Sequence, residues 1–277
     1  MYIDVPNQAV PAANGVSYAY RRYGPSSPPP LLLLQHFRGT LDSWDPALVD
    51  LLAARRDVIT FDNTGVGLST GRTPRTVREM AVDALSFLAA LGLDRVDLLG
   101  HSTGGFVAQE IALIRPGVLR RLVLAATAPR GAAGVHGWSD DIVAHVHSDR
   151  LGAQDYLYTF FNHTETSQHS GLEFFGRYIE RTRDRDLPVS REAREAQYEA
   201  VVEWGIPDHD ALQRLRAISR PVLVAGGDND LVTPPHLSHV LGGMLPNARV
   251  HIYPDSGHGF LFQHHKDFAA EVLEFLD

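Results

Sequence analysis

The sequence predicts a mostly parallel α/β sheet with helices on both of its faces, and three observations lead to this fold class. Short apolar runs alternate with helical patterns along most of the 277 residues. Some runs, such as residues 31–34, are apolar at every position, which is typical of strands buried on both faces. The alternation stops between about residues 129 and 217, and it resumes at Pro221.

The predicted strands follow one another at intervals that leave room for crossover helices. The first one, residues 16–23, alternates in polarity and is expected to pair antiparallel at an edge. The predicted strands that follow are residues 31–34, 58–61, 96–99, 122–125, 222–225 and 250–253. We expect a doubly wound, mostly parallel, eight-stranded sheet.

Two predicted helices stand out between these strands. Thr76 and Glu79 have the spacing of a capping box, apolar residues then recur at helical spacing, and Gly92 provides a stop. The helix after Ser102 has almost no polar face, so it should be largely buried, and Pro116 ends it.

The interrupting segment has no strand pattern and is rich in aromatic and charged residues. A structureless loop of this length is implausible in a compact domain, so a helical cap packed over the end of the sheet is expected. The domain prediction is therefore residues 1–128 for the first part of the core, 129–217 for the cap and 218–277 for the second part of the core.

Composition narrows the class of protein and its partners. A formal net charge of −8 does not indicate binding to nucleic acid or to an anionic membrane. No cysteine is present, which rules out disulfides and thiolate chemistry and fits a cytoplasmic protein. No apolar run approaches the ~20 residues of a membrane span, and no secretory signal is visible. We expect a small-molecule substrate as the partner.

Residues 100–104 read Gly-His-Ser-Thr-Gly and match the pattern G-x-S-x-G. The pattern alone is weak, but it directly follows an apolar strand and directly precedes a helix, as a nucleophile elbow requires. A serine on such a turn stands at a helix N-terminus, where free N–H groups stabilise an oxyanion. Ser102 is therefore the candidate nucleophile; the alternative is a glycine-rich turn that only packs a helix on a sheet.

His258 is the candidate general base among 14 histidines. It lies between glycines, after the last predicted strand and before the last helix, at the same end of the sheet as Ser102. A serine hydroxyl needs such a base to become a good nucleophile. The alternative interpretation is a histidine that caps the helix.

The loop after residues 222–225 offers two carboxylates that could orient the imidazole. Asp230 is preferred over Asp228, because Thr233 and Pro234 are predicted to be the cap and first position of the next helix, which leaves Asp230 in the loop proper. Asp228 would instead make local turn hydrogen bonds.

These motifs together resemble the α/β-hydrolase superfamily over essentially the whole chain. The order Ser102, Asp230, His258 is that family's order, and Pro234 follows the acid at the family's spacing. Residues 62–69 match its D-x-x-G-x-G-x-S segment. The resemblance implies the α/β-hydrolase fold, a Ser-His-Asp triad and no cofactor.

One segment departs from the family pattern. The resemblance implies that the backbone N–H groups of Phe37 and Thr103 form the oxyanion hole. His36 stands where members of the family usually have glycine, so the local backbone is expected to differ. We interpret His36 as a supporting or substrate-binding residue, not as the base. Arg38 either binds a polar group of the substrate or is solvated.

The aromatic residues of the segment 129–217 either line a substrate pocket or form the core of the cap. The candidates for substrate binding are Tyr156, Phe160, Phe161 and Trp204. The pairs His145 with His147 and His264 with His265 are interpreted as surface residues, because neither lies near a convincing third metal ligand. No metal is predicted.

The sequence therefore predicts a serine hydrolase that cleaves a carboxylic ester or lactone through an acyl-enzyme on Ser102. One alternative keeps the triad and cleaves C–C bonds or forms peracids, as haloperoxidase-like members do. An alternative of another class is a non-catalytic small-molecule receptor. The aromatic cap favours a partly apolar substrate, and the sequence leaves open whether the protein is a monomer or a homodimer.

Overall fold

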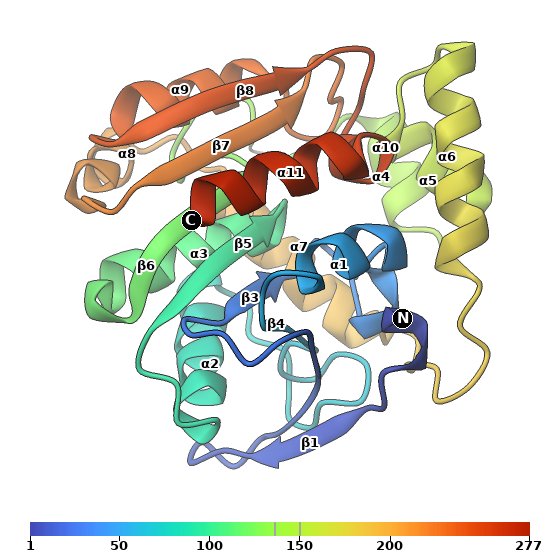
Figure 1. The fold of residues 1–277 in the computed structure, drawn as a ribbon. Helices are drawn as coiled ribbons and strands as arrows, with labels where there is room; N and C mark the ends of the chain where they lie inside the picture. The colour runs from blue at the N-terminus through green and yellow to red at the C-terminus, as the bar shows by residue number, and fades with distance from the viewer. Residues whose placement is uncertain (136, 150) are drawn as a thin grey trace.

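A computed structural model describes residues 1–135, 137–149 and 151–277. Its centre is one eight-stranded sheet with the strand order β1-β2-β4-β3-β5-β6-β7-β8 (Figure 1). β2 pairs antiparallel with both β1 and β4, and all the other neighbouring strands pair parallel. The strands are β1 Gln8–Pro11, β2 Ser17–Tyr23, β3 Leu31–Leu34, β4 Val58–Phe61, β5 Val96–His101, β6 Leu119–Ala125, β7 Val222–Gly227 and β8 Ala248–Tyr253.

Helices cover both faces of the sheet. The helices are α1 Pro46–Ala53, α2 Val77–Ala90, α3 Thr103–Ile114, α4 Asp140–Val146, α5 Ala153–Phe160, α6 Glu165–Tyr178, α7 Arg191–Trp204, α8 His209–Gln213, α9 His236–Met244, α10 Phe260–Gln263 and α11 His265–Leu276. Short 3-10 helices occupy Tyr2–Asp4, Leu41–Ser43, Pro116–Val118 and Arg214–Ala217. In the described residues, no helix is both long and apolar enough to cross a bilayer.

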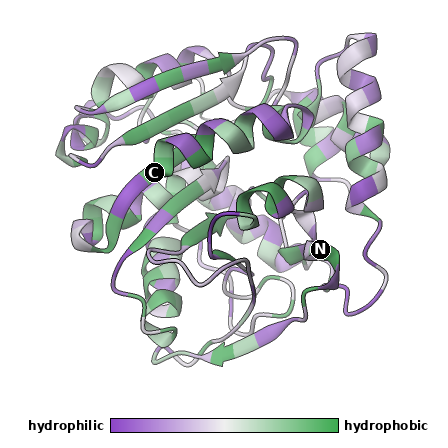
Figure 2. Cartoon of the chain, viewed as in Figure 1, coloured by the Kyte–Doolittle hydropathy of each residue, from purple (hydrophilic) through white to green (hydrophobic). Residues whose placement is uncertain are grey.

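Alternate residues of the central strands enter two separate hydrophobic cores. Leu32 and Leu34 pack with α2, α3 and α9, whereas Leu31 and Leu33 pack with α1 and α11. The run of four leucines follows from this arrangement, because both faces of β3 are covered. The central strands are accordingly mostly hydrophobic in Figure 2.

The predicted fold class and the apolar strands are confirmed, with small differences at their ends. β1 was not identified individually, because it is a short edge strand whose residues are largely exposed. Only half of the predicted capping box forms. The hydroxyl of Thr76 accepts a hydrogen bond from Glu79 N–H, but the Glu79 carboxylate accepts from that hydroxyl instead of from the Thr76 backbone.

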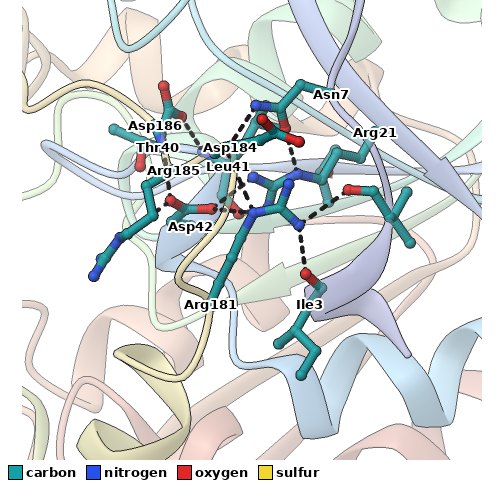
Figure 3. Close-up of polar contacts among 12 residues, drawn as sticks. Ile3, Asn7, Arg21, Thr40, Leu41, Asp42, Arg181, Asp184, Arg185 and Asp186 are labelled. Atoms are coloured by element: carbon teal, nitrogen blue, oxygen red, sulfur yellow. Dashed lines mark hydrogen bonds and ion pairs between the residues drawn. The ribbon is translucent and has the colours of Figure 1, made fainter.

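The segment between β6 and β7 contains helices α4 to α8 and, in its described residues, no strand. Its linker after α6 is fastened to the core by a buried polar cluster (Figure 3). The Asp42 carboxylate lies 2.6 Å from Arg21 and 3.7 Å from Arg181, and it accepts a hydrogen bond from Asp186 N–H at 2.8 Å. Arg181 also donates to the backbone oxygen of Ile3. The insertion is thereby attached to the N-terminal segment and to the loop after β3.

Candidate active site

The candidate residues come from four strands that end at the same edge of the sheet. Ser102 directly follows β5, His36 follows β3, and Asp230 and His258 lie in the loops after β7 and β8. Because β3, β5, β6, β7 and β8 are parallel, their carboxyl ends point the same way. This is the edge at which open α/β sheets bind their ligands.

Ser102 adopts a backbone conformation that is rare outside glycine, with φ 56° and ψ −119°. Its N–H donates to Ala125 O at 2.9 Å, and its carbonyl accepts from the Thr127 hydroxyl at 2.7 Å. Both neighbours lie at the end of β6, so the adjacent strand supports the strained turn. The turn places Ser102 as the N-cap of α3 and Thr103 as its first residue. The Thr103 N–H therefore has no acceptor in a preceding helical turn.

The glycines on either side of Ser102 are required by close backbone contacts. A Cβ on Gly100 would overlap the carbonyl of Gly104, and a Cβ on Gly104 would overlap the carbonyl of Leu34. Helix α3 thus approaches strands β3 and β5 more closely than any side chain would allow. The G-x-S-x-G pattern follows from this packing.

Asp230 and His258 form a buried pair. The distance between His258 Nδ1 and Asp230 Oδ2 is 2.8 Å, and both side chains are almost fully buried. Asp230 also accepts hydrogen bonds from the N–H groups of Val232 and Thr233, each at 2.8 Å, and from the Thr233 hydroxyl at 2.7 Å. An ionised carboxylate only accepts, so Nδ1 of His258 is the donor in this hydrogen bond and Nε2 is the ring nitrogen left to act as a base.

Asp228 has a different place in the same loop. It accepts hydrogen bonds from Ser256 N–H and from the Asn229 side chain, as the local-turn interpretation expected. The predicted cap at Thr233 is wrong: α9 begins at His236, two residues after Pro234. The Thr233 hydroxyl is instead directed at Asp230, because the loop turns back over the carboxylate before the helix starts.

His101 holds the loop that carries His258. Its Nε2 lies 3.1 Å from the backbone oxygen of His258, and the two rings lie 5.1 Å apart. Burial lowers the pKa of His101 well below its usual range, and the neighbouring His258 and His36 lower it further. His101 is therefore neutral, and because a carbonyl only accepts, its Nε2 carries the proton.

His36 and Arg38 flank Phe37 after β3. The His36 ring is buried, and its Nδ1 lies 2.8 Å from the Phe37 carbonyl oxygen. Arg38 has a positive φ of 61°, and its N–H donates to the Gln197 side chain of α7. Its guanidinium donates to the carbonyls of Val146 and Ser148 at the end of α4. The solvated interpretation of Arg38 is wrong, because the side chain is buried and fastens the insertion.

The catalytic candidates and part of the insertion enclose one narrow cavity of about 40 Å³. At ~10–15 Å³ for each water molecule, it has room for about three. Four of the predicted binding residues line it, together with both Ser102 and His258. Among the described residues, the lining consists of His36, Phe37, Arg38, Ser102, Trp138, His145, Val146, Leu151, Asp155, Tyr156, Thr159, Phe160, Val232 and His258. Residues such as Leu151, Thr159 and Val232 were missed because nothing in their chemistry distinguishes them from packing residues.

Phe161 and Trp204, both predicted to bind substrate, lie elsewhere. Phe161 packs against Phe174 in the core beneath α6. Trp204 stacks on Phe106 at 5.0 Å, and its indole N–H donates to Ala128 O. Both side chains are almost fully buried in packing that holds the insertion to the core, so the cavity interpretation is wrong for them.

The histidine pairs take part in local contacts. His145 lines the cavity, and its Nδ1 lies 2.9 Å from Asp155 Oδ1. The His147 ring packs against Tyr198 at 4.5 Å. His264 and His265 both contact backbone carbonyls near the start of α11.

Comparisons with known proteins agree with this architecture. The solved structure of an alpha/beta hydrolase fold protein from Chitinophaga pinensis is 39% identical, covers 100% of this chain and 98% of its own, and has a TM-score of 0.93. A Mycobacterium tuberculosis protein named "Putative non-heme bromoperoxidase BpoC" is 28% identical, over 89% of this chain and 93% of its own length. A Caulobacter protein named "Putative carbamate hydrolase RutD" is 29% identical, over 84% and 85%.

The family model described as alpha/beta hydrolase fold matches residues 29–265, which include the whole candidate site. The order of strands, the strained serine turn and the buried aspartate–histidine pair are in keeping with this match. The chain therefore belongs to the alpha/beta hydrolase fold family.

Proposed function

We propose that the chain is a serine hydrolase that cleaves a carboxylic ester or lactone through an acyl-enzyme on Ser102. The observation that carries the proposal is one cavity lined by both Ser102, on its strained turn, and His258, whose Nδ1 lies 2.8 Å from Asp230. This combination supplies a nucleophile, a base with a free lone pair and a carboxylate that orients the base.

The proposed reaction has two halves. Ser102 Oγ attacks the carbonyl carbon while its proton moves to His258 Nε2, and the N–H groups of Phe37 and Thr103 stabilise the oxyanion. The intermediate collapses, and the leaving alkoxide takes the proton from His258. Water then loses a proton to His258 and attacks the acyl carbon, and the released Ser102 oxygen regains that proton. The helices of residues 129–217 serve as the cap over this site.

A second candidate reaction is the formation of a peracid, in which hydrogen peroxide replaces water in the second half. The name of the Mycobacterium tuberculosis relative, a putative non-heme bromoperoxidase, favours it. Cleavage of a C–C bond by the same residues is a further alternative.

The first experiment combines labelling by a fluorophosphonate with hydrolysis of 4-nitrophenyl esters of increasing chain length. Ser102→Ala should lose labelling and at least ~10⁴-fold in kcat/KM, while the control Ser170→Ala, on the outer helix α6, should keep both. Labelling without ester hydrolysis would favour a lactone or C–C substrate. Absence of labelling in the wild type would overturn the proposal and favour a binding protein.

Peroxide and acetate, added with bromide and a chromogenic acceptor, test the second candidate. Bromination that depends on both Ser102 and acetate would support peracid formation, because the peracid is the oxidant. Bromination unaffected by Ser102→Ala would exclude it.

A further inference from the structure

The polar atoms around the narrow cavity are few, and most already have partners. Asp155 is held by His145 and by Gly152 N–H. The Arg38 guanidinium donates to two carbonyls of the insertion. Apart from the proposed nucleophile and base, two buried polar atoms of the lining residues have no partner in the described parts of the chain: Arg38 Nε, which can only donate, and His36 Nε2.

The hydrogen bond of His36 decides which of its nitrogens carries the proton. Its Nδ1 lies 2.8 Å from the Phe37 carbonyl oxygen, which only accepts, so Nδ1 is the donor. Burial, with a smaller contribution from the nearby His258, lowers the pKa of His36 to about 4, so the ring is neutral near pH 7. Nε2 therefore presents a lone pair that accepts a hydrogen bond.

The ring is held in place by aromatic packing and lies beside the proposed oxyanion hole. Its centroid is 5.2 Å from those of His101 and Phe160, both in edge-on contact. It directly precedes Phe37, whose N–H is the proposed donor to the oxyanion. Because His36, Phe37 and Ser102 line the same cavity of about 40 Å³, a carbonyl bound there would have the atoms next to its carbon close to the His36 ring.

We propose that His36 selects acyl groups with an N–H or O–H donor one or two bonds from the carbonyl carbon, such as carbamoyl and 2-hydroxyacyl groups. This inference rests on the proposed function and adds a substrate class to it. A buried acceptor that faces a methyl group loses its hydrogen bond, so sites of this kind discriminate against isosteres that lack the donor. The small cavity agrees with a short acyl group.

The test compares two esters of matched shape, phenyl glycolate and phenyl propanoate, which differ by a hydroxyl in place of a methyl. The ratio of their kcat/KM values is divided by the ratio of their rates of hydrolysis by hydroxide, which removes intrinsic reactivity. We expect a corrected ratio of at least about tenfold for the wild type, equivalent to ~1.4 kcal/mol.

Two variants test whether that preference comes from the hydrogen-bond acceptor of His36. His36→Phe keeps the ring and should bring the corrected ratio close to one. His36→Gln, whose amide oxygen accepts a hydrogen bond, should restore part of it. Each ratio is measured within one variant, so a general loss of activity cancels, and thermal unfolding checks that both variants fold.

The outcomes separate this inference from the proposed function. A wild-type ratio near one with both esters hydrolysed through Ser102 would overturn the role of His36 and leave the serine hydrolase intact. A preference that survives in His36→Phe would do the same. Failure of the fluorophosphonate to label the wild type would overturn both.

Discussion

Asp230 illustrates how one side chain determines the protonation of another. Its carboxylate accepts three hydrogen bonds from residues 232 and 233, and a fourth contact goes to His258 Nδ1. The backbone around the acid is thereby fixed without help from the histidine. Asp230 can orient the imidazole of His258 because the position of the carboxylate does not depend on the histidine.

Asp230→Asn should reduce kcat by about 10³–10⁴-fold, because an amide nitrogen facing His258 favours the wrong tautomer of the imidazole. Steady-state hydrolysis of a 4-nitrophenyl ester measures the effect. Asp228→Asn is the matched control in the same loop, and it should change kcat less than about threefold, since Asp228 contacts Ser256 and not His258. Equal losses in the two variants would remove the distinction between these aspartates.

At the scale of elements, two carboxylates join the linker after α6 to the core. Leu41 N–H donates to Asp62 Oδ1 and to Asp186 Oδ2, at 2.9 and 3.0 Å. A Cβ on Gly67 would lie 2.5 Å from an oxygen of each carboxylate. Burial raises the pKa of Asp62 well above its usual range, and the charge of Asp186 and a hydrogen bond with it add to the shift.

This acid pair gives a pH dependence with a definite sign. Because the pKa of Asp62 is raised in the folded state, its stabilising contribution is complete at low pH and is lost as pH rises through the folded pKa. Asp186→Asn removes one of the two charges, so its free energy of unfolding should rise relative to that of the wild type as pH increases from 4 to 8. Urea denaturation at several pH values measures both slopes.

Asp184→Asn, in the exposed part of the same linker, is the control and should follow the wild type. Asparagine also tolerates the positive φ of 48° at this position. If the free energy of unfolding of Asp186→Asn changed with pH as steeply as that of the wild type, the two carboxylates would titrate independently of each other.

The strands and the candidate residues at their carboxyl ends could be predicted from the sequence, because each of them has a local sequence pattern. Residues 31–34 and 58–61 form β3 and β4 with the predicted bounds, since strands buried on both faces are largely apolar and rich in β-branched or large hydrophobic residues. Phe161 and Trp204 were misplaced for the opposite reason. Aromatic residues in a helical insertion have the same pattern whether they face a cavity or a core, and only tertiary packing separates the two.

For the whole molecule, the buried histidines set a lower limit to the pH range of stability. The pKa of His36 is lowered from 6.5 to about 4 by burial, and that of His101 is also lowered. The unfolded chain therefore binds more protons below pH 6.5, and stability falls as pH drops from 6.5 toward 4. At ~1.4 kcal/mol per pKa unit, His36 accounts for a loss on the order of 3 kcal/mol.

His36→Phe should lose less stability than the wild type over that interval, although the contribution of His101 remains. Guanidinium denaturation at pH 7, 5.5 and 4.5 checks the difference. His239→Phe is a suitable control on the outer helix α9, because that side chain is exposed. If the wild type and His36→Phe lost stability in parallel, His36 would have to be protonated in the folded protein.

The hydrogen bond from Arg38 N–H to Gln197 joins the loop after β3 to helix α7, 159 residues further along the chain. The loop that carries the Phe37 amide is therefore tied to the insertion, so a displacement of the insertion would shift this loop as well. A substrate too large for the cavity would displace the insertion and pull that amide away from the reacting carbonyl. Selection by size would then be expressed in the turnover number more than in affinity, as expected when closure around the substrate assembles the site.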